Sequence, residues 1–171
     1  MRTVDLLIME LDQEAKTTRC VLERVPGDKL AWKPHEKSMS LGQLALHIAQ
    51  VPGVVAEMSR QSPYHVRDFI QPSAQSASEL VPTLEESVAK AKQILGSMDE
   101  AELGKTWTAM MGGQEIMAIQ VGAMLRTIML NHWYHHRGQL SVYLRQVGVP
   151  VPSIYGPSAD ENPFMQRAAA V

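Results

Sequence analysis

Two histidines four residues apart, His132 and His136, are the residues of this sequence best suited to do chemistry. Residues 118–147 contain no proline and carry apolar residues at helical spacing, so we expect one long helix with both imidazoles on one face. At about 100° per residue the pair lies near the centre of an apolar arc that includes Leu125 and Met129. Unpaired polar groups buried there would cost about 1–3 kcal/mol each. A shared metal ion is the simplest explanation for the pair.

The alternative is a pair of ordinary core histidines, because a histidine on an apolar stripe is more often hydrogen-bonded than metal-bound. Trp133, Tyr134 and His135 separate the pair, so the glutamate that serves as general base in HExxH metalloproteases is absent. This excludes a protease of the thermolysin type. His135 points about 100° away from His136 and is expected in a supporting or surface position.

A third histidine on another predicted helix favours the metal interpretation. Ser40 and Gln43 form a capping-box pattern that predicts the start of a helix, and His47 lies on the core-facing side of that helix. Three neutral imidazoles bind a borderline divalent ion such as Zn²⁺ or Ni²⁺ and leave coordination positions open. His47, His132 and His136 are therefore the candidate metal ligands.

Other polar residues near this stripe have weaker assignments. Gln139 and Tyr143 continue the stripe and either line a pocket or are ordinary, partly buried residues. Glu14 is the nearest carboxylate, but it lies at the edge of the first predicted helix stripe, so no catalytic residue is assigned. His35 and His65 fall in predicted loops and receive no role.

Composition limits the classes of protein to which the chain can belong. With 171 residues, of which 45% are hydrophobic and 20% charged, it is long enough for one domain and too apolar for disorder. The net charge of −2 and the lack of a Lys/Arg cluster argue against a nucleic-acid partner. The single cysteine, Cys20, excludes an internal disulfide. Without a signal-peptide pattern or an apolar run of about 20 residues, we expect a cytoplasmic protein that does not contact membranes.

Four amphipathic stretches predict helices, at about residues 3–24, 41–55, 83–98 and 118–147. A kink or short break is expected at Pro52-Gly53. Residues 61–81 are rich in Ser, Gln and Pro and predict a long connection with little regular structure. Residues 99–117 form either a hairpin or an ordered loop.

These elements predict an all-α fold, a four-helix bundle with a long crossover between helices 2 and 3. Such bundles build metal sites from side chains on facing helices. We expect residues 1–160 to form a single domain and residues 161–171 a C-terminal tail.

Three segments of the sequence also occur together in a known family. They are Ser40-Leu41-Gly42-Gln43-Leu44 leading to His47, the HxxxHRGQ segment from His132 to Leu140, and Tyr155-Gly156-Pro157. Over nearly its whole length the chain resembles the DinB (damage-inducible) family of metal-dependent enzymes. The resemblance implies a four-helix bundle, commonly dimeric, in which three histidines hold a divalent metal. By position these are His47, His132 and His136.

The resemblance also implies a choice of functions. Its relatives include transferases that use a low-molecular-weight thiol, and metal-dependent hydrolases. We therefore expect, first, a metal-dependent thiol S-transferase in detoxification or stress response, acting on small molecules as a homodimer. A metal-dependent hydrolase, a non-catalytic metal-binding stress protein and a plain helical bundle remain as alternatives. The family name refers to induction by DNA damage and does not indicate DNA binding.

Overall fold

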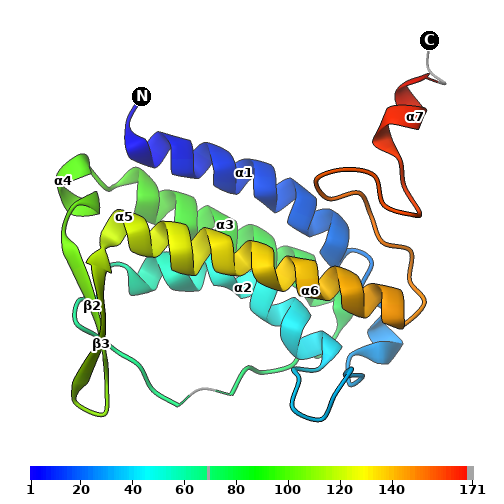
Figure 1. The fold of residues 1–171 in the computed structure, drawn as a ribbon, viewed down its shortest axis with the longest axis horizontal. Coiled ribbons are helices and arrows are strands. Elements are labelled where there is room, and N and C mark those ends of the chain that lie inside the picture. The colour runs from blue at the N-terminus through cyan, green and yellow to red at the C-terminus, as the bar shows by residue number, and fades with distance from the viewer. Residues whose placement is uncertain (69, 169–171) are drawn as a thin grey trace.

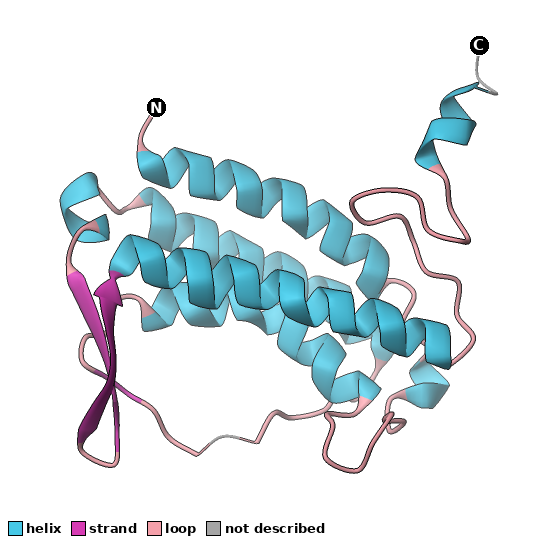
Figure 2. Ribbon diagram, in the orientation of Figure 1, coloured by secondary structure: helices cyan, strands magenta, loops and turns pink. Residues whose placement is uncertain are grey.

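The computed structural model of the protein describes residues 1–68 and 70–168. Within these residues the chain is mostly helical, with a small sheet at one end of the long helices (Figure 2). The long helices lie side by side (Figure 1) and comprise α1 (Thr3–Leu22), α2 (Leu41–Met58), α3 (Leu80–Gly96) and the continuous α5 (Val121–Met124), η3 (Leu125–Asn131) and α6 (His132–Gln146). No helix in the described part of the chain combines the length and apolar character needed to span a membrane.

Local sequence patterns predicted the start of α2 correctly and the start of α3 incorrectly. At α2 the predicted capping box is confirmed, because Ser40 Oγ accepts from the Gln43 amide at 3.2 Å and Gln43 Oε1 accepts from the Ser40 amide at 2.9 Å. The start expected for α3 near Thr83 is wrong. Helix α3 begins at Leu80 because the short helix η2 (Ala77–Glu79) leads directly into it.

Helix α2 runs continuously through Pro52, so of the two expectations for Pro52-Gly53, a kink or a short break, the break is wrong. Proline has no amide hydrogen, so the carbonyl of Ile48 loses its partner four residues on. That carbonyl instead accepts a hydrogen bond from the indole Nε1 of Trp133 on α6, at 2.8 Å. The defect in α2 is therefore repaired by a neighbouring helix.

A second repair comes from α3. Ser87 Oγ accepts from the Gly53 amide at 2.8 Å and donates to the Gln50 carbonyl at 3.0 Å. A Cβ atom on Gly53 would lie 2.9 Å from the Ser87 carbonyl oxygen. Glycine at this position therefore permits the close approach of α2 and α3.

The structure contains a small three-stranded sheet, so the expectation of an all-α fold is wrong and the fold is mostly helical. Its order is β1 (Tyr64–His65), β2 (Thr106–Met111) and β3 (Gln114–Gln120), with β1 parallel and β3 antiparallel to β2. Gly112 and Gly113 connect β2 to β3 with φ values of 57° and 81°, the backbone conformation that a two-residue hairpin turn requires. The hairpin interpretation of residues 99–117 is thus confirmed, after the short helix α4 (Glu100–Leu103).

The long fourth helical segment contains a π-helical turn, η3. Because a π turn holds more residues than an α turn, the positions after it are rotated relative to a regular helix. The fully buried residues beyond the turn are Trp133, Arg137, Leu140 and Leu144. His132 and His136 are only partly buried beside them. The prediction that the buried arc is centred on the two histidines is therefore wrong: it is centred about one position later, on Trp133 and Arg137.

After α6 the chain turns at Gly148, whose φ of 77° fits the expected helix-ending position. Residues 149–162 then run without helix or strand toward α1, and α7 (Pro163–Ala168) lies in the segment expected to be a tail (Figure 1).

Candidate metal site

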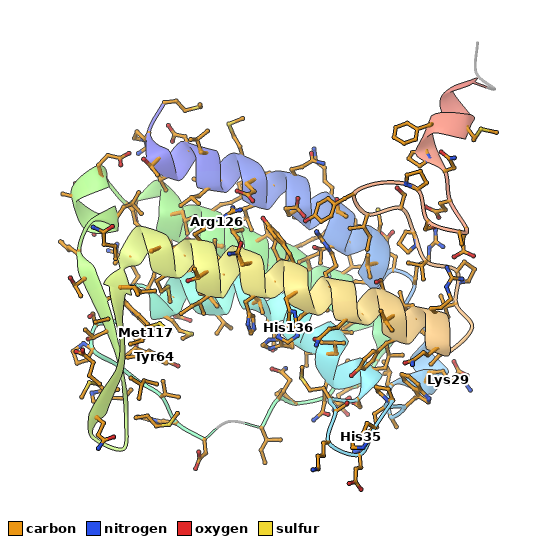
Figure 3. All side chains as sticks on the ribbon, viewed as in Figure 1. Lys29, His35, Tyr64, Met117, Arg126 and His136 are labelled. Carbon is orange, nitrogen blue, oxygen red and sulfur yellow. The ribbon has the colours of Figure 1, made fainter. Side chains whose placement is uncertain are left out.

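The three candidate ligands meet in space. His47 on α2 and His132 and His136 on α6 each offer a ring nitrogen, and the three nitrogens lie within 4.8 Å of one another. The Nε2 atoms of His47 and His132 are 3.0 Å apart. Figure 3 shows His136 on the side of α6 that faces α2 and the connection between α2 and α3. The three histidines are close enough to bind one metal ion.

Helix packing sets the register of these ligands. Trp133 and Ile48, which share the hydrogen bond at the Pro52 defect, directly follow His132 and His47 in the chain. The contact that repairs α2 therefore also determines how the histidines of α6 face the histidine of α2.

A glutamine in the connection fixes the protonation pattern of His47. Gln71 Nε2 donates to the Pro72 carbonyl at 3.3 Å, so the other amide atom, Oε1, faces His47 Nδ1 at 3.0 Å. An amide oxygen only accepts, so His47 carries its hydrogen on Nδ1 and presents the Nε2 lone pair to the cluster. Gln71 is itself held by Gln43 Nε2, which donates to its carbonyl at 2.8 Å, and by Gln50 Oε1 at 3.2 Å.

His136 has a similar partner on its own helix. Its Nδ1 atom lies 2.7 Å from Gln139 Oε1, which leaves Nε2 for the cluster. Gln139 is exposed and does not line the cavity beside the histidines. Tyr143 does not line it either: its hydroxyl donates to the Met39 carbonyl at 3.4 Å and its ring packs edge-on against Trp32. Of the two interpretations of Tyr143, the ordinary partly buried residue is correct.

The donor set suits a divalent ion. Two nitrogen ligands of a tetrahedral Zn²⁺ lie about 3.3 Å apart, given bonds of about 2.0–2.1 Å. The 3.0 Å between His47 and His132 is near this value. In the absence of a metal, this contact needs a hydrogen on His132 Nε2, because His47 Nε2 presents a lone pair. His47 and His136 also have a hydrogen-bond partner on the second ring nitrogen, Gln71 and Gln139, as metal-binding histidines usually do.

The electrostatics favour neutral imidazoles. Burial, with smaller contributions from the neighbouring histidines His136 and His47, lowers the pKa of His132 from 6.5 to about 4. Burial also lowers the pKa of His47 and His136, partly offset by their hydrogen bonds to Gln71 and Gln139. All three are therefore in the neutral form that metal coordination requires at neutral pH.

A buried ion pair lies on the opposite side of α6. Arg137, 1% exposed, places Nη2 2.5 Å from Glu14 Oε2 on α1 and donates to the Tyr155 hydroxyl, while Nη1 donates to Thr18 Oγ1 at 3.1 Å. The Tyr155 hydroxyl donates to Glu14 Oε2 at 2.8 Å. Glu14 is thus a structural partner of Arg137, and the pair joins α1, α6 and the C-terminal segment.

The remaining histidines lie outside the cluster. His135 is exposed, with its ring 5.0 Å from that of His136, in agreement with a supporting or surface position. His35 is exposed in a loop, remote from the site (Figure 3). His65 was expected to have no role, yet it lies on β1 and lines a cavity of about 870 Å³ that His47 and His132 also line.

Fold and site together define a helical protein with a three-histidine centre between two helices. The sequence profile of the DinB family matches residues 1–166, and the chain belongs to that family.

Individual relatives agree with this assignment. The chain is 25% identical over 166 residues to the uncharacterized protein YrdA of Bacillus subtilis (strain 168), covering 94% of this chain and 92% of YrdA. A DinB-like protein from Bacillus cereus ATCC 10987 has 22% identity and a TM-score of 0.67, covering 87% of this chain and 95% of its own. The DinB-like protein YjoA from Bacillus subtilis has 23% identity and a TM-score of 0.66, covering 87% and 96%. At these identities the two structures show the shared fold.

Two contributors to the site were not found from the sequence. Gln71 lies in an irregular connection where no periodic pattern indicates a direction. The sequence assigns no role to Trp133, although Pro52 inside a predicted helix leaves a carbonyl that needs a donor from elsewhere.

Proposed function

We propose that the protein is a divalent-metal-dependent thiol S-transferase, with His47, His132 and His136 as ligands of Zn²⁺ or Ni²⁺. The observation that carries the proposal is the cluster of three ring nitrogens within 4.8 Å, beside a cavity large enough for a small molecule. In this proposal the long helical segments act as a four-helix bundle that holds the ligands, and the connection between α2 and α3 is the crossover that supplies Gln71.

A bound metal would supply one kind of chemistry: it would lower the pKa of a coordinated thiol, which free in water at pH 7 is only a few per cent ionised. In the overall reaction the sulfur forms a bond to an electrophilic carbon, the leaving group departs with the electrons of its broken bond, and the thiol proton passes to solvent. The chain holds the three imidazoles neutral by burial and orients His47 through Gln71.

The absence of a carboxylate from the histidine group among the described residues favours transfer over hydrolysis. Metal-bound water would keep a pKa of about 7, so its attack would gain from a positioned general base. A metal-bound thiol would be fully ionised and would need no base. Of the cavity carboxylates, Glu57 is paired with Lys90 at 2.7 Å and Asp68 is exposed. Hydrolysis remains the second candidate function.

The test offers the metal-loaded protein a panel of low-molecular-weight thiols with one reactive alkyl halide. We expect transfer with at least one thiol, about one metal ion per chain, and loss of both in His136→Ala. His135→Ala is the matched control, because His135 is the exposed neighbour on the same helix. Equal transfer by the two variants would refute the proposal. Metal binding without transfer would point to hydrolysis or to a non-catalytic metal protein.

We extend the proposal to detoxification or stress response in the cytoplasm and to a homodimer. The support is membership of the DinB family and the resemblance of the motifs. Light scattering should give the mass of two 19.0 kDa chains. A single-chain mass at micromolar concentration would remove the dimer without affecting the metal site.

A further inference from the structure

The cavity beside the histidines is long. It lies between α2 and the connection that follows it, and its lining extends along α2 from His47 to Met58. These two residues are 11 positions apart in a helix that rises about 1.5 Å per residue, a span of about 16 Å. The cavity volume of about 870 Å³ lies in the range of sites that enclose drug-sized ligands.

The wall of the cavity is apolar from the histidines onward. Val51, Val54, Val55 and Met58 follow His47 at four, seven, eight and eleven positions, so they share its face of α2, and all line the cavity. Ile128 of the π turn lines it too. Val54 is 50% exposed, although apolar side chains on a helix face that borders the core are usually covered.

The charged residues on the cavity do not favour a charged ligand. Arg67 and Asp68 are adjacent in the chain and of opposite sign, and Glu57 is paired with Lys90. The charged residues of the lining therefore do not create an electrostatic potential of one sign. The apolar stripe of Val51, Val54, Val55 and Met58, in contrast, is continuous.

We propose that this cavity binds the apolar body of the electrophilic substrate, an uncharged alkyl or aryl group, and so holds the reactive carbon at the histidine end. The inference rests on the proposed S-transferase activity and names the substrate class. Its physical basis is that each methylene moved from water onto the stripe of Val51, Val54, Val55 and Met58 adds hydrophobic free energy, whereas a small polar substrate would leave the stripe wet.

The test measures binding without turnover. A series of 1-alkanols from butanol to octanol is titrated into the purified, metal-loaded protein, with the methyl resonances of Met58 and Ile128 as the readout. We expect the dissociation constant to fall about fourfold per added methylene. A constant independent of chain length would overturn the proposal.

Val54→Asp should weaken octanol binding at least tenfold, because it places a charge on the stripe. Val142→Asp is the control, since Val142 on α6 is 56% exposed, comparable with 50% for Val54, and does not line the cavity. Both sites are exposed, so both variants should fold and keep their metal. Equal octanol binding by the two variants would overturn the proposal. Chain-length-dependent binding without thiol transfer would refute only the S-transferase assignment.

Discussion

The indole Nε1 of Trp133 donates a hydrogen bond to the carbonyl oxygen of Ile48 at 2.8 Å, at the turn of α2 where Pro52 supplies no amide hydrogen. The donor is buried and adjacent to His132, and the acceptor is adjacent to His47. A helix defect and a candidate metal ligand pair are therefore joined by one contact.

Removing the Trp133 indole donor should lower the free energy of unfolding most when Pro52 is present, because Pro52 cannot donate to the Ile48 carbonyl. We expect Trp133→Phe to destabilise the protein by about 1–3 kcal/mol, because it leaves the buried Ile48 carbonyl without a partner. In a Pro52→Ala background the alanine amide can bond to Ile48, so the same substitution should cost less. Urea unfolding of the four proteins of this double-mutant cycle measures the difference. Equal costs in the two backgrounds would show that the indole does not compensate for Pro52.

Gln71 should control metal affinity without contacting the metal. Replacing it with leucine removes the acceptor that holds the Nδ1 hydrogen of His47, and such supporting partners typically contribute about 10–100-fold to affinity. We therefore expect Gln71→Leu to raise the metal dissociation constant by that factor, measured by competition with a chelator. Gln75→Leu, an exposed glutamine of the same connection, is the control. Unchanged affinity in Gln71→Leu would contradict the role assigned to the amide.

The Arg137–Glu14 pair between α6 and α1 should contribute far more to stability than the exposed Lys92–Asp12 pair between α3 and α1. Arg137→Ala leaves a largely buried carboxylate, since the Glu14 side chain is 11% exposed, and breaking such pairs costs about 3–5 kcal/mol. Lys92→Ala is the comparison, because Lys92 and Asp12 form a pair whose side chains are 42% and 44% exposed, typically worth less than about 1 kcal/mol. Denaturant midpoints test this, and similar losses in both variants would refute it.

The stability of the metal-free protein should depend on pH through His132. Its pKa is about 4 in the folded protein, against an ordinary value of 6.5, so between these values the unfolded chain binds more protons. The contribution of His132 to stability is therefore complete above about pH 6.5 and is lost as the pH falls toward 4. His132→Gln should flatten the dependence of the unfolding midpoint in this window. A variant with the same slope as the wild type would show that His132 is not held neutral by burial.

The parts of the fold that follow local rules were predictable from the sequence. The capping box at Ser40, the ending of the last long helix at Gly148 and the meeting of His47 with His132 and His136 all rest on short-range spacing or on inward-facing polar residues. The motifs that resemble the DinB family predicted membership of that family, which the match of its profile to residues 1–166 confirms.

Other features depend on tertiary contacts and could not be predicted in this way. The π turn at η3 rotates α6 and places Arg137 in the core, where a charged residue is normally read as surface. Strand β1 exists because a two-residue segment of the connection pairs with β2, and two residues carry no periodic signal. Gln71 and His47 are 24 positions apart in the chain and lie in different elements. Sequence spacing does not predict which way a side chain points across such a separation.

The cluster formed by Arg137, Glu14 and Tyr155 also has a consequence during synthesis on the ribosome. Glu14 and Tyr155 are separated by 141 positions, so the guanidinium receives its full set of partners only when almost all of the chain has emerged. Until then, the desolvation cost of burying Arg137 against α1 is only partly offset by its hydrogen bonds. We therefore expect the docking of α1 onto α6 to be a late step. A nascent chain halted before Tyr155 should therefore remain sensitive to protease along α1, although its histidines are already present.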